Sequence, residues 1–391
     1  MNILVFTSLW PSREQPAHGI FVRHRIAALS RRPEVRIRVV APVPWFPSGW
    51  QSKSLPGHWR RAARMPEREE IEGLMTCHPR YFMLPKIGMR FQAAGMAHGA
   101  FELARRLHEE DPIDIIDAHY AYPDGVAASR IGDRLNIPVF ITVRGTDLNL
   151  FPRWRSIRRR LREGLEKATG VIAVSRSLRD RLLDLGIPAD LIAVVPNGVD
   201  RSLFHWRDRD EARRALGLAR DEKIVLSVGS LVPAKGFEDL IRATSLPLHR
   251  NLKLYLIGEG PQRPMLTALI EQLGLVKRVH LRGAVSQAEL PDWYAAADLF
   301  CLPSHREGCP NVVLEALACG TPVVATDVGD LNTLLSNPPS GRIIPVDSVE
   351  ELSDALAWAL EQPWDRAEIA RQGSARSWDQ VADELLRLYQ K

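Results

Sequence analysis

Residues 299–327, which read LFCLPSHREGCPNVVLEALACGTPVVATD, constrain the fold more strongly than any other stretch of the chain. The apolar run 298–303 predicts a buried strand, and the polar, glycine-containing run 304–309 predicts a loop. A helical pattern follows over 311–319, and residues 323–325 return as a second short apolar strand. A strand, a helix and another strand in this order predict half of a βαβ unit in a parallel sheet.

The loop and the helix of this stretch also offer a place for a ligand, because open parallel sheets bind ligands at the carboxyl ends of their strands. Pro310 suits the first helical position and Gly320 suits the stop, so free amides and a positive dipole end are expected from Gly308 onward. Glu307 lies in the loop, and Glu315 lies on a helix stripe directed towards that N-terminus. Taken alone, the two glutamates could also be a solvated loop charge and an exposed helix residue.

Strand and helix signals alternate through the first half of the chain. Apolar runs predict strands at residues 2–7, 35–40, 78–84, 113–119, 139–143, 170–174 and 192–195. Helical patterns fall at residues 20–31, 89–109 and 177–185, the last with Ser175 as its N-cap. Residues 42–72 have no clean period and contain the aromatic residues Trp45, Phe46, Trp50 and Trp59, which favours a surface excursion.

A second series of strands follows a charged boundary at residues 201–222. Its apolar runs are at residues 223–229, 252–257, 279–283, 299–303 and 323–325, and a last helical pattern covers 376–391. The sequence therefore predicts an α/β fold with two Rossmann-like, doubly wound domains. The expected boundaries are 1–200 for the first domain, 201–222 for a linker, 223–375 for the second domain and 376–391 for a C-terminal helix.

Composition places the chain among soluble globular proteins, with 45% hydrophobic and 25% charged residues in 391. No apolar run approaches the roughly 20 residues that a membrane helix needs. The N-terminus begins directly as a strand, so we expect no signal peptide. Four cysteines, Cys77, Cys301, Cys309 and Cys319, lack metal-binding spacing and suit reduced thiols, which favours a cytoplasmic location.

Positive charge is concentrated in one part of the first half. Between Arg144 and Leu182 there are eleven Lys and Arg residues against four Asp and Glu, while the whole chain carries a net charge of +5. The predicted helix within 153–167 separates arginines from an apolar stripe that runs from Trp154 to Leu165. It could be a core-packed helix with a solvated basic side, or a surface for anionic lipid on the inner face of the plasma membrane. Nucleic acid is a third possibility, but no motif of aromatic residues interleaved with basic ones supports it.

Two further loops carry residues suited to a diphosphate. The run SVGSLVPAKGFEDLIRA places Lys235 in a loop between a strand and a helix, where a lysine can put a point charge on a phosphate. The run LIGEGPQRPML contains Gly258 and Gly260, but two glycines at this spacing are a weak signal without a third. Taken alone, Lys235 could be a solvated loop residue.

The run EGCPNVVLEALACGTPVVATDVG resembles the Glu-x7-Glu signature of retaining GT-B glycosyltransferases that use nucleotide sugars, glycosyltransferase family 4 or glycosyl transferases group 1. The resemblance covers nearly the whole chain. It implies two Rossmann-like domains that face each other across a cleft, and a last helix that crosses back to the first domain. It also implies transfer with retention of the anomeric configuration and with neither a metal nor a cofactor.

The resemblance assigns roles to residues of the second domain. Glu307 and Lys235 would be catalytic, one orienting the sugar and the other stabilising the diphosphate. The donor-binding residues would be Glu315, Gly229, Ser230, Gly258, Gly260, Gly308, Cys309, Pro310, Asn311 and Val312. Many members have arginine where this chain has Ser230, which leaves Lys235 and backbone amides with more of the phosphate contact.

In the first domain, the run IDIIDAHYAYPDGVAA places His119 just beyond a strand, where the family has a histidine that lines the donor sugar's site. A lone histidine is more often structural. The run ITVRGTDLN resembles a family loop that usually has histidine at the position of Arg144. The resemblance implies that Arg144, Asp147 and Gly19 lie on the acceptor side.

The runs LWPSREQPAHGIFVRHRIAAL and HPRYFMLP are similar to the bacterial subgroup that builds cell-surface polysaccharides, including teichuronic acid enzymes. The expected activity is therefore transfer of a sugar from a UDP- or GDP-sugar to a growing, lipid-linked surface glycan. Two other functions stay open. One is a sugar-nucleotide epimerase of GT-B fold, which would need no acceptor, and the other is a non-catalytic scaffold that binds nucleotide sugar without turnover.

Overall fold

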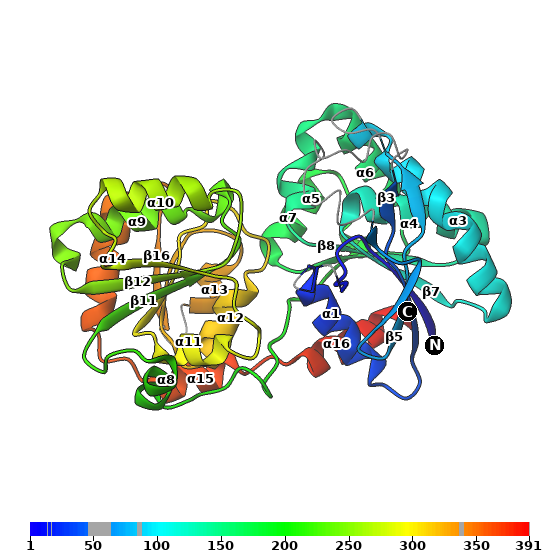
Figure 1. The fold of residues 1–391 in the computed structure, drawn as a ribbon. Helices are drawn as coiled ribbons and strands as arrows, with labels where there is room; N and C mark the ends of the chain where they lie inside the picture. Colours follow the sequence, from blue (N-terminus) through cyan, green and yellow to red (C-terminus); the bar gives the residue numbers. More distant parts are fainter. Residues whose placement is uncertain (14, 17, 46–63, 84–87, 336–339, 391) are drawn as a thin grey trace. The chain divides into compact units, whose positions relative to one another are not determined.

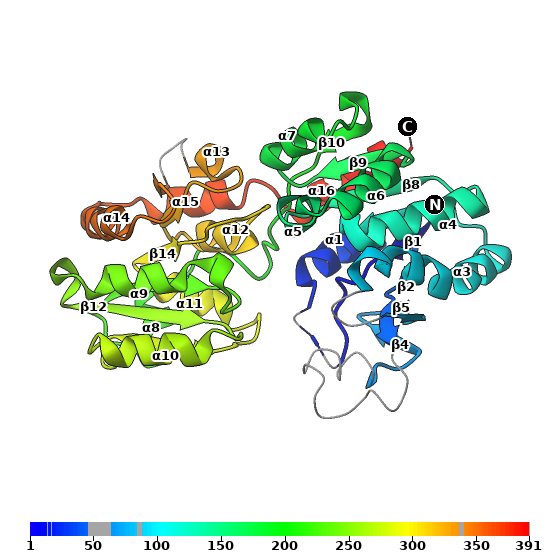
Figure 2. The same cartoon turned by 90° about the horizontal axis from the view of Figure 1, so that it is seen from above.

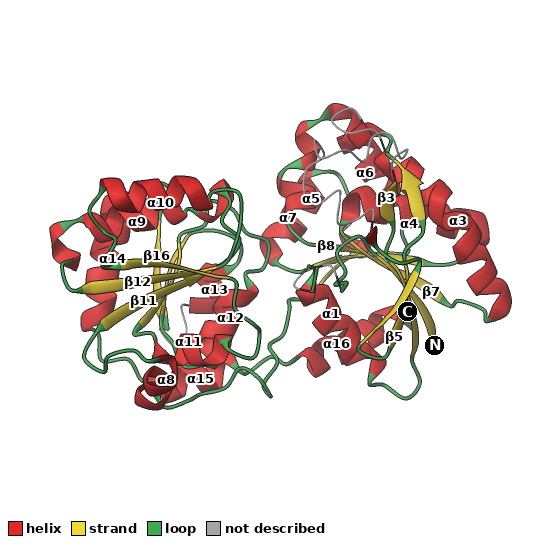
Figure 3. Cartoon of the chain, viewed as in Figure 1, coloured by secondary structure: helices red, strands yellow, loops and turns green. Residues whose placement is uncertain are grey.

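The computed structural model describes residues 1–391 except 14, 17, 46–63, 84–87, 336–339 and 391. The chain forms two compact units, one made of Met1–Asn197 with Trp378–Lys391 and the other of Gly198–Ser377 (Figure 1). Each unit is an α/β layer structure with its own sheet (Figure 3). Among the described residues, no helix is long and apolar enough to cross a membrane.

The first unit has an eight-stranded sheet in the order β10-β9-β8-β7-β1-β2-β5-β4. Neighbouring strands are parallel except β4 and β5, which pair antiparallel. The strands are β1 (Asn2–Phe6), β2 (Arg36–Val40), β4 (Arg68–Ile71), β5 (Leu74–Cys77), β7 (Ile115–His119), β8 (Val139–Val143), β9 (Gly170–Ala173) and β10 (Ile192–Val194). A separate pair joins β3 (Val43–Trp45) to β6 (Arg80–Phe82).

Helices cover both faces of this sheet (Figure 2). They are α1 (Ile20–Ser30), α3 (Gln92–Glu110), α4 (Val126–Leu135), the short α5 (Thr146–Asn149), α6 (Arg155–Glu166), α7 (Arg176–Asp184) and α16 (Trp378–Tyr389). The last helix packs beside α1, and its buried Val381 and Leu385 share a core cluster with Val22 and Ile26. The C-terminal helix is therefore part of the first unit's core.

The second unit has a fully parallel sheet in the order β13-β12-β11-β14-β15-β16. The strands are β11 (Lys223–Val228), β12 (Leu252–Ile257), β13 (Val279–Gly283), β14 (Leu299–Leu302), β15 (Val323–Thr326) and β16 (Gly341–Ile344). The helices are α8 (Arg209–Leu216), α9 (Phe237–Ser245), α10 (Arg263–Gln272), α11 (Leu290–Ala296), α12 (Asn311–Ala318), α13 (Leu331–Leu335), α14 (Val349–Glu361) and α15 (Arg366–Gly373).

Alternate residues of the central strand β11 supply two separate cores. Ile224 and Leu226 face the cluster that contains α11 and α12, whereas Val225 faces the cluster that contains α9 and α14. Since side chains along a strand point alternately to the two faces, this division shows that helices pack on both faces of the sheet. A strand buried on both faces reads as a continuous apolar run, which is why the second series was recognisable in the sequence.

Several expectations about the elements were wrong. Residues 201–222, expected to be a linker, contain α8, which packs on α11 within the second unit. Its Arg213 is buried and donates to the carbonyl of Ala296 and to the carboxylate of Asp298, so a charged run forms part of the interior. The strands β3, β4, β5 and β16 were not predicted.

The expected surface excursion over residues 42–72 includes the strands β3 and β4. Strand β4 follows a charged run, but its Glu69 is buried 2.8 Å from the Nε2 atom of His78. Glu69 and His78 thus form a buried polar pair, and an apolar pattern in the sequence does not reveal the segments that it joins. Phe46, Trp50 and Trp59 lie outside the described residues, as does Leu84 at the end of one predicted strand.

Candidate functional site

The point where strand order reverses in the second sheet is the natural place for a site. From β11 the chain adds β12 and β13 on one side, and it then returns to add β14, β15 and β16 on the other. The loops after β11 and β14 therefore leave the sheet at neighbouring carboxyl ends and diverge, which opens a crevice for ligands in folds of this kind. Lys235 belongs to the first of these loops and Glu307 to the second.

Lys235 and Glu307 form an ion pair across this reversal. The Nζ atom of Lys235 lies 2.5 Å from Oε1 of Glu307, and Ser304 donates its hydroxyl to the same oxygen at 2.7 Å. The Lys235 side chain is 25% exposed and that of Glu307 is 11% exposed, so both are sheltered but reachable from solvent. A fixed positive charge and a fixed carboxylate thus stand at one spot, suited to a phosphate and to sugar hydroxyls respectively.

The two loops are also joined by their backbones. The amide of His305 donates to the carbonyl of Ala234 at 2.9 Å, directly beside Lys235. Gly236 has a φ of +63°, and a Cβ atom there would lie 1.9 Å from the carbonyl oxygen of Pro303. Only glycine allows the first loop to approach the second this closely, which fixes the height of Lys235 above the sheet.

The predicted glycines lie on the neighbouring turns. Gly229 and Ser230 follow β11, and Gly258 and Gly260 follow β12. The amide of Gly229 donates to the carbonyl of Ile257 at 2.9 Å, so the first pair of these residues is tied to the second strand's end. Ser230 is exposed at this edge, and its position beside Gly229 is open to a ligand.

The segment 308–312 forms the entry to α12. Gly308 and Pro310 are buried, while Cys309, Asn311 and Val312 are partly buried. Pro310 was expected at the first helical position, but it is the N-cap residue, with a φ of −77° and a ψ of 94°. The helix starts one residue later because this ψ is extended, and the amides that follow still point out of the helix N-terminus.

Glu315 lies within α12 and is partly buried. Its Oε2 atom accepts a hydrogen bond of 2.8 Å from the hydroxyl of Tyr294. Burial raises the pKa of Glu315 to about 7, and the bond from Tyr294 opposes that rise. A carboxyl group balanced in this way near neutrality is more typical of a functional site than of an exposed helix residue.

The strand order of the first sheet also reverses once, between β1 and β7. Ser8 follows β1, and its amide and hydroxyl both donate to the carboxylate of Asp124, which begins the segment leading into α4. Burial raises the pKa of Asp124 to about 7. This carboxylate ties the loop after the first strand to the segment after β7.

His119 is fully buried at the end of β7 and has protein groups at both ring nitrogens. Arg144 donates to its Nδ1 atom at 2.8 Å, and Oδ2 of Asp117 lies 3.2 Å from its Nε2 atom. Because an arginine can only donate, the neutral ring carries its proton on Nε2, towards Asp117. Burial lowers the pKa of His119 to about 4. The structure thus encloses His119 beneath Arg144, and its predicted contact with the donor sugar stays a prediction.

The acceptor-side residues of the sequence prediction are spread over two loops of the first unit. Arg144 is 9% exposed and also donates to Oδ1 of Asn197 at 3.2 Å. Asp147 is fully buried and accepts backbone amides of Ala121, Arg144 and Gly145 at 2.7 to 3.1 Å. Asp147 therefore holds loops together. Of Arg144 and Asp147, Arg144 is the one nearer to solvent.

Gly19, the third of these residues, caps the N-terminus of α1 with a φ of +63°. A Cβ atom there would lie 2.1 Å from the carbonyl oxygen of Leu9. The glycine therefore allows the loop after β1 to fold back onto the start of the helix.

Several residues that complete these arrangements were missed. Ser304 and Tyr294 orient the predicted site residues Glu307 and Glu315, respectively. In the first unit, Asp117 lies against His119. Asp117 had a recognisable signal, since residues two apart on a strand share a face. Tyr294 had none, because it lies in an apolar run and its polar contact is made with another helix.

Among the described residues, one group has the composition of a metal site. Asp239, His305 and Asp347 place one possible ligand atom each within 4.8 Å of one another. His305 lies 2.8 Å from Asp239, and Asp347 is exposed. Acidic groups of this kind commonly gather beside a histidine without a metal, and we assign them none.

The basic helix α6 packs through the apolar stripe that its sequence predicted, apart from its first member. Ile157, Leu161 and Leu165 are buried, but Trp154 is 44% exposed. Phe91 lies beneath the guanidinium of Arg160, 5.7 Å from ring centre to Cζ, and is 64% exposed. The outer side of α6 therefore presents arginines next to two exposed aromatic rings. We call this surface, formed by α6 with Phe91 and Trp154, the basic face.

Two family models match the chain. The model described as "Glycosyl transferases group 1" matches residues 208–376, and the model described as "Glycosyltransferase Family 4" matches residues 61–203. A putative teichuronic acid biosynthesis glycosyltransferase, TuaC of Bacillus subtilis, is 31% identical over 370 residues, which are 93% of this chain and 90% of that protein.

Two solved structures share the fold over the whole length. Sucrose-phosphate synthase of Thermosynechococcus elongatus has a TM-score of 0.80 at 21% identity, with 100% of this chain and 98% of that chain covered. Anabaena Alr3699/HepE, solved in complex with UDP, has a TM-score of 0.72 at 21% identity, with 99% of each chain covered. At 21% identity, the similarity to these two structures shows that the fold is shared and nothing more.

Proposed function

The chain belongs to the glycosyl transferases group 1 family and has the fold of GT-B glycosyltransferases, and from this premise we propose that it transfers a sugar from a UDP- or GDP-sugar to a surface-glycan acceptor. The observation that carries the proposal is the pair formed by Lys235 and Glu307 across the strand-order reversal of the second sheet. If Lys235 and Glu307 were only solvated loop residues, they would have no reason to meet at the edge of the sheet where such folds bind ligands.

The second unit supplies a group for each part of a nucleotide sugar. Glu315 would accept the ribose hydroxyls, as acidic residues do in other nucleotide-binding sheets. Lys235 and the amides at the start of α12 would hold the diphosphate. Glu307 would then orient the sugar through its hydroxyls. The UDP complex of the Anabaena protein supports a uridine donor, and UDP is the nucleotide to test first.

We propose that the transfer retains the anomeric configuration and needs no metal. The leaving diphosphate gains negative charge as the glycosidic bond breaks, and Lys235 places a positive charge where that charge develops. The acceptor would attack on the face that the diphosphate leaves, so the departing phosphate can take the acceptor's proton. The protein's share of the reaction is then electrostatic and positional.

The first unit would bind the acceptor. Arg144 is the most exposed charged residue of its buried cluster, and an acceptor with a phosphate or a carboxylate would suit it. Gly19 and Asp147 would shape the loops around it, and His119 would orient Arg144 from below. The similarity to the putative teichuronic acid enzyme supports a cell-surface polysaccharide as the acceptor class.

A nucleotide screen by thermal unfolding tests the proposal. We expect UDP or GDP, without added metal, to raise the unfolding temperature of the purified chain, because a ligand that binds only the folded state stabilises it. Glu315→Ala should weaken this nucleotide about 10- to 100-fold, since hydrogen bonds to charged groups contribute about 1.5–3 kcal/mol. Glu271→Ala, on the exposed side of α10, is the matched control and should bind as the parent does. If neither nucleotide shifts the unfolding temperature, the donor site is wrongly assigned.

We also propose that the basic face of α6 rests on anionic lipid, which would bring the enzyme to a lipid-linked acceptor. A basic residue near an anionic surface contributes about 1 kcal/mol, so Arg155→Glu with Arg158→Glu should weaken vesicle binding at least about tenfold. The measurement is sedimentation with phosphatidylcholine vesicles, with and without phosphatidylglycerol. The same charge change at the exposed Arg214 and Arg220 is the control. Equal losses in both double variants would point to net charge alone.

A further inference from the structure

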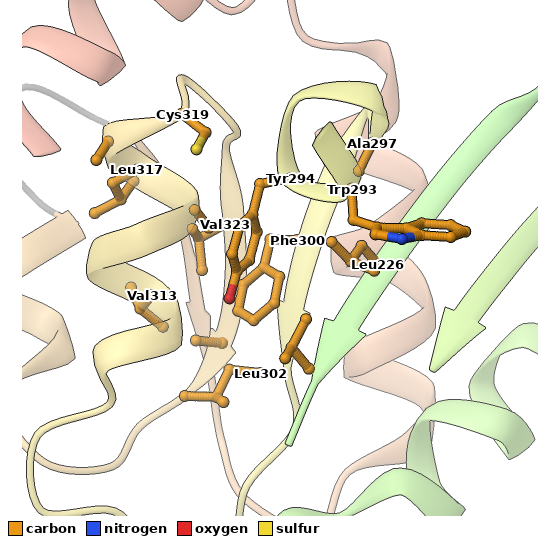
Figure 4. Packing of buried hydrophobic residues seen from close by; sticks show 14 of the residues in the cluster. Leu226, Trp293, Tyr294, Ala297, Phe300, Leu302, Val313, Leu317, Cys319 and Val323 are labelled. Carbon is orange, nitrogen blue, oxygen red and sulfur yellow. The ribbon is translucent and has the colours of Figure 1, made fainter. Parts of the chain in front are cut away.

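Tyr294 places its hydroxyl within a largely apolar cluster of the second unit. Its side chain is fully buried on α11, and its ring packs edge-on against Phe300 with centroids 5.6 Å apart (Figure 4). Phe204 makes a second edge contact at 6.0 Å. Val313 and Leu317 of α12 line the same cluster. A ring enclosed in this way has one orientation, so the direction of its hydroxyl is fixed.

That hydroxyl meets Glu315. It donates to Oε2 at 2.8 Å, from a different helix and 21 residues away in sequence. A glutamate side chain on a helix surface can rotate about several bonds, and a bond to an immobile phenol removes much of that freedom. The carboxylate is left with one oxygen held by the core and a second oxygen, Oε1, whose direction is thereby set.

We propose that Tyr294 is a positioning residue, which holds Glu315 by Oε2 so that Oε1 meets the ribose hydroxyls of the nucleotide. The inference rests on the proposed function, because it takes the ribose as the partner of Glu315. In this way a completely buried tyrosine contributes to nucleotide recognition without contacting the nucleotide.

The same bond also keeps Glu315 a good acceptor. Burial raises the pKa of its carboxyl, and the phenol opposes this because a donated hydrogen bond favours the ionised form. Without the hydroxyl, the buried carboxyl would be protonated over more of the neutral range and would accept hydroxyl protons less well. Orientation and ionisation therefore both depend on Tyr294.

The alternative is that Tyr294 only fills the core, and a tyrosine-to-phenylalanine exchange can separate the two. We would measure by calorimetry the affinity of Tyr294→Phe for UDP and GDP and for their 2′,3′-dideoxy forms. The expected result is about a tenfold loss with the nucleotide that the parent binds, in line with the loss of one hydrogen bond to a charged group. Its dideoxy form should bind the parent and the variant equally, because it has no ribose hydroxyls for Glu315 to accept.

Tyr255→Phe is the matched control. Tyr255 belongs to the same buried cluster, but its ring packs between His280 and Trp293. The Tyr255→Phe variant should bind the nucleotide as tightly as the parent protein does. A second variant completes the cycle, since Tyr294→Phe should cause no further loss when Glu315 is already alanine.

Three outcomes would overturn the inference. An unchanged affinity in Tyr294→Phe would do so alone, and so would an equal loss with the normal and the dideoxy nucleotide, which would indicate a general disturbance of the core. A parent protein that binds neither UDP nor GDP would overturn the proposed function together with the inference. The affinity of the parent protein therefore tells the two failures apart.

Discussion

Replacing Lys235 with alanine is expected to lower kcat for sugar transfer by about 10²- to 10³-fold, the range seen when one preorganised group that stabilises transition-state charge is removed. The lysine stands at the ligand edge of the second sheet, paired with Glu307 at 2.5 Å and fixed by the turn at Gly236. Charge on the diphosphate grows as the sugar leaves, so the loss should fall mainly on kcat and less on the affinity for the nucleotide. Initial rates at saturating donor, with release of free nucleotide as the signal, measure it.

Lys253 provides the control for this variant. It lies on β12 in the same unit, its side chain is 28% exposed against 25% for Lys235, and it also makes an ion pair, with Glu222 at 3.8 Å. Lys253→Ala should leave kcat within about twofold of the parent, because it lies away from the transition-state charge. Lys235→Arg should recover part of the rate, since it restores the charge with a different shape. A kcat that is unchanged in Lys235→Ala would show that the diphosphate is held elsewhere.

The second large effect is expected at Asp117, in the first unit. Asp117 is completely buried in the middle of β7, two residues before His119, and the charge of the buried Arg25 acts on it. Burial by itself would raise the pKa of Asp117, but His119 and Arg25 hold it below its usual range. Asp117→Asn removes the negative charge and leaves Arg25 and Arg144 in the interior. We expect the first unit to lose about 3–5 kcal/mol of stability, because the loss of the opposite charge leaves buried cations uncompensated.

Hydrogen exchange measured peptide by peptide suits this test, because it reports the opening of each unit separately. Peptides from β1, β7 and β8 should exchange faster in Asp117→Asn, while those from β11 and β14 should not change. Asp133→Asn removes an aspartate from an exposed ion pair with Lys167, at 2.7 Å, and should cost less than about 1 kcal/mol. Equal exchange in the two variants would mean that the charge of Asp117 is not needed.

Most of the sheet could be predicted from the sequence because parallel strands buried on both faces are continuous apolar runs. The residues predicted at 139–143, 252–257 and 279–283 coincide with β8, β12 and β13. The strands that were missed lie at sheet edges or beside charge. Strand β4 contains Glu69, whose burial depends on His78. The pair forms only in the tertiary structure, so no local sequence pattern predicts it.

The candidate site likewise has a part that could be predicted from the sequence and a part that could not. Glu307, Glu315 and Lys235 stand in loops or helices whose place at the sheet edge follows from the order of elements, and that part could be predicted. Their partners could not. Lys235 and Glu307 are 72 residues apart, and Tyr294 reaches Glu315 from the core. His119 shows the limit most clearly, because the sequence placed it at the right strand end but could not show that Arg144 covers it.

The position of α16 has a consequence for how the protein is made. A ribosome releases the chain in order, so strands β1 to β10 emerge first, and the whole second unit follows before Trp378–Tyr389 appears. Until then the apolar surface beside α1 that Val381 and Leu385 cover in the complete unit stays exposed. The middle unit is one continuous segment and can fold as it emerges, as domains generally do during synthesis. The first unit to be synthesised is therefore the last to be completed, and its exposed apolar face is where we expect a nascent-chain chaperone to bind.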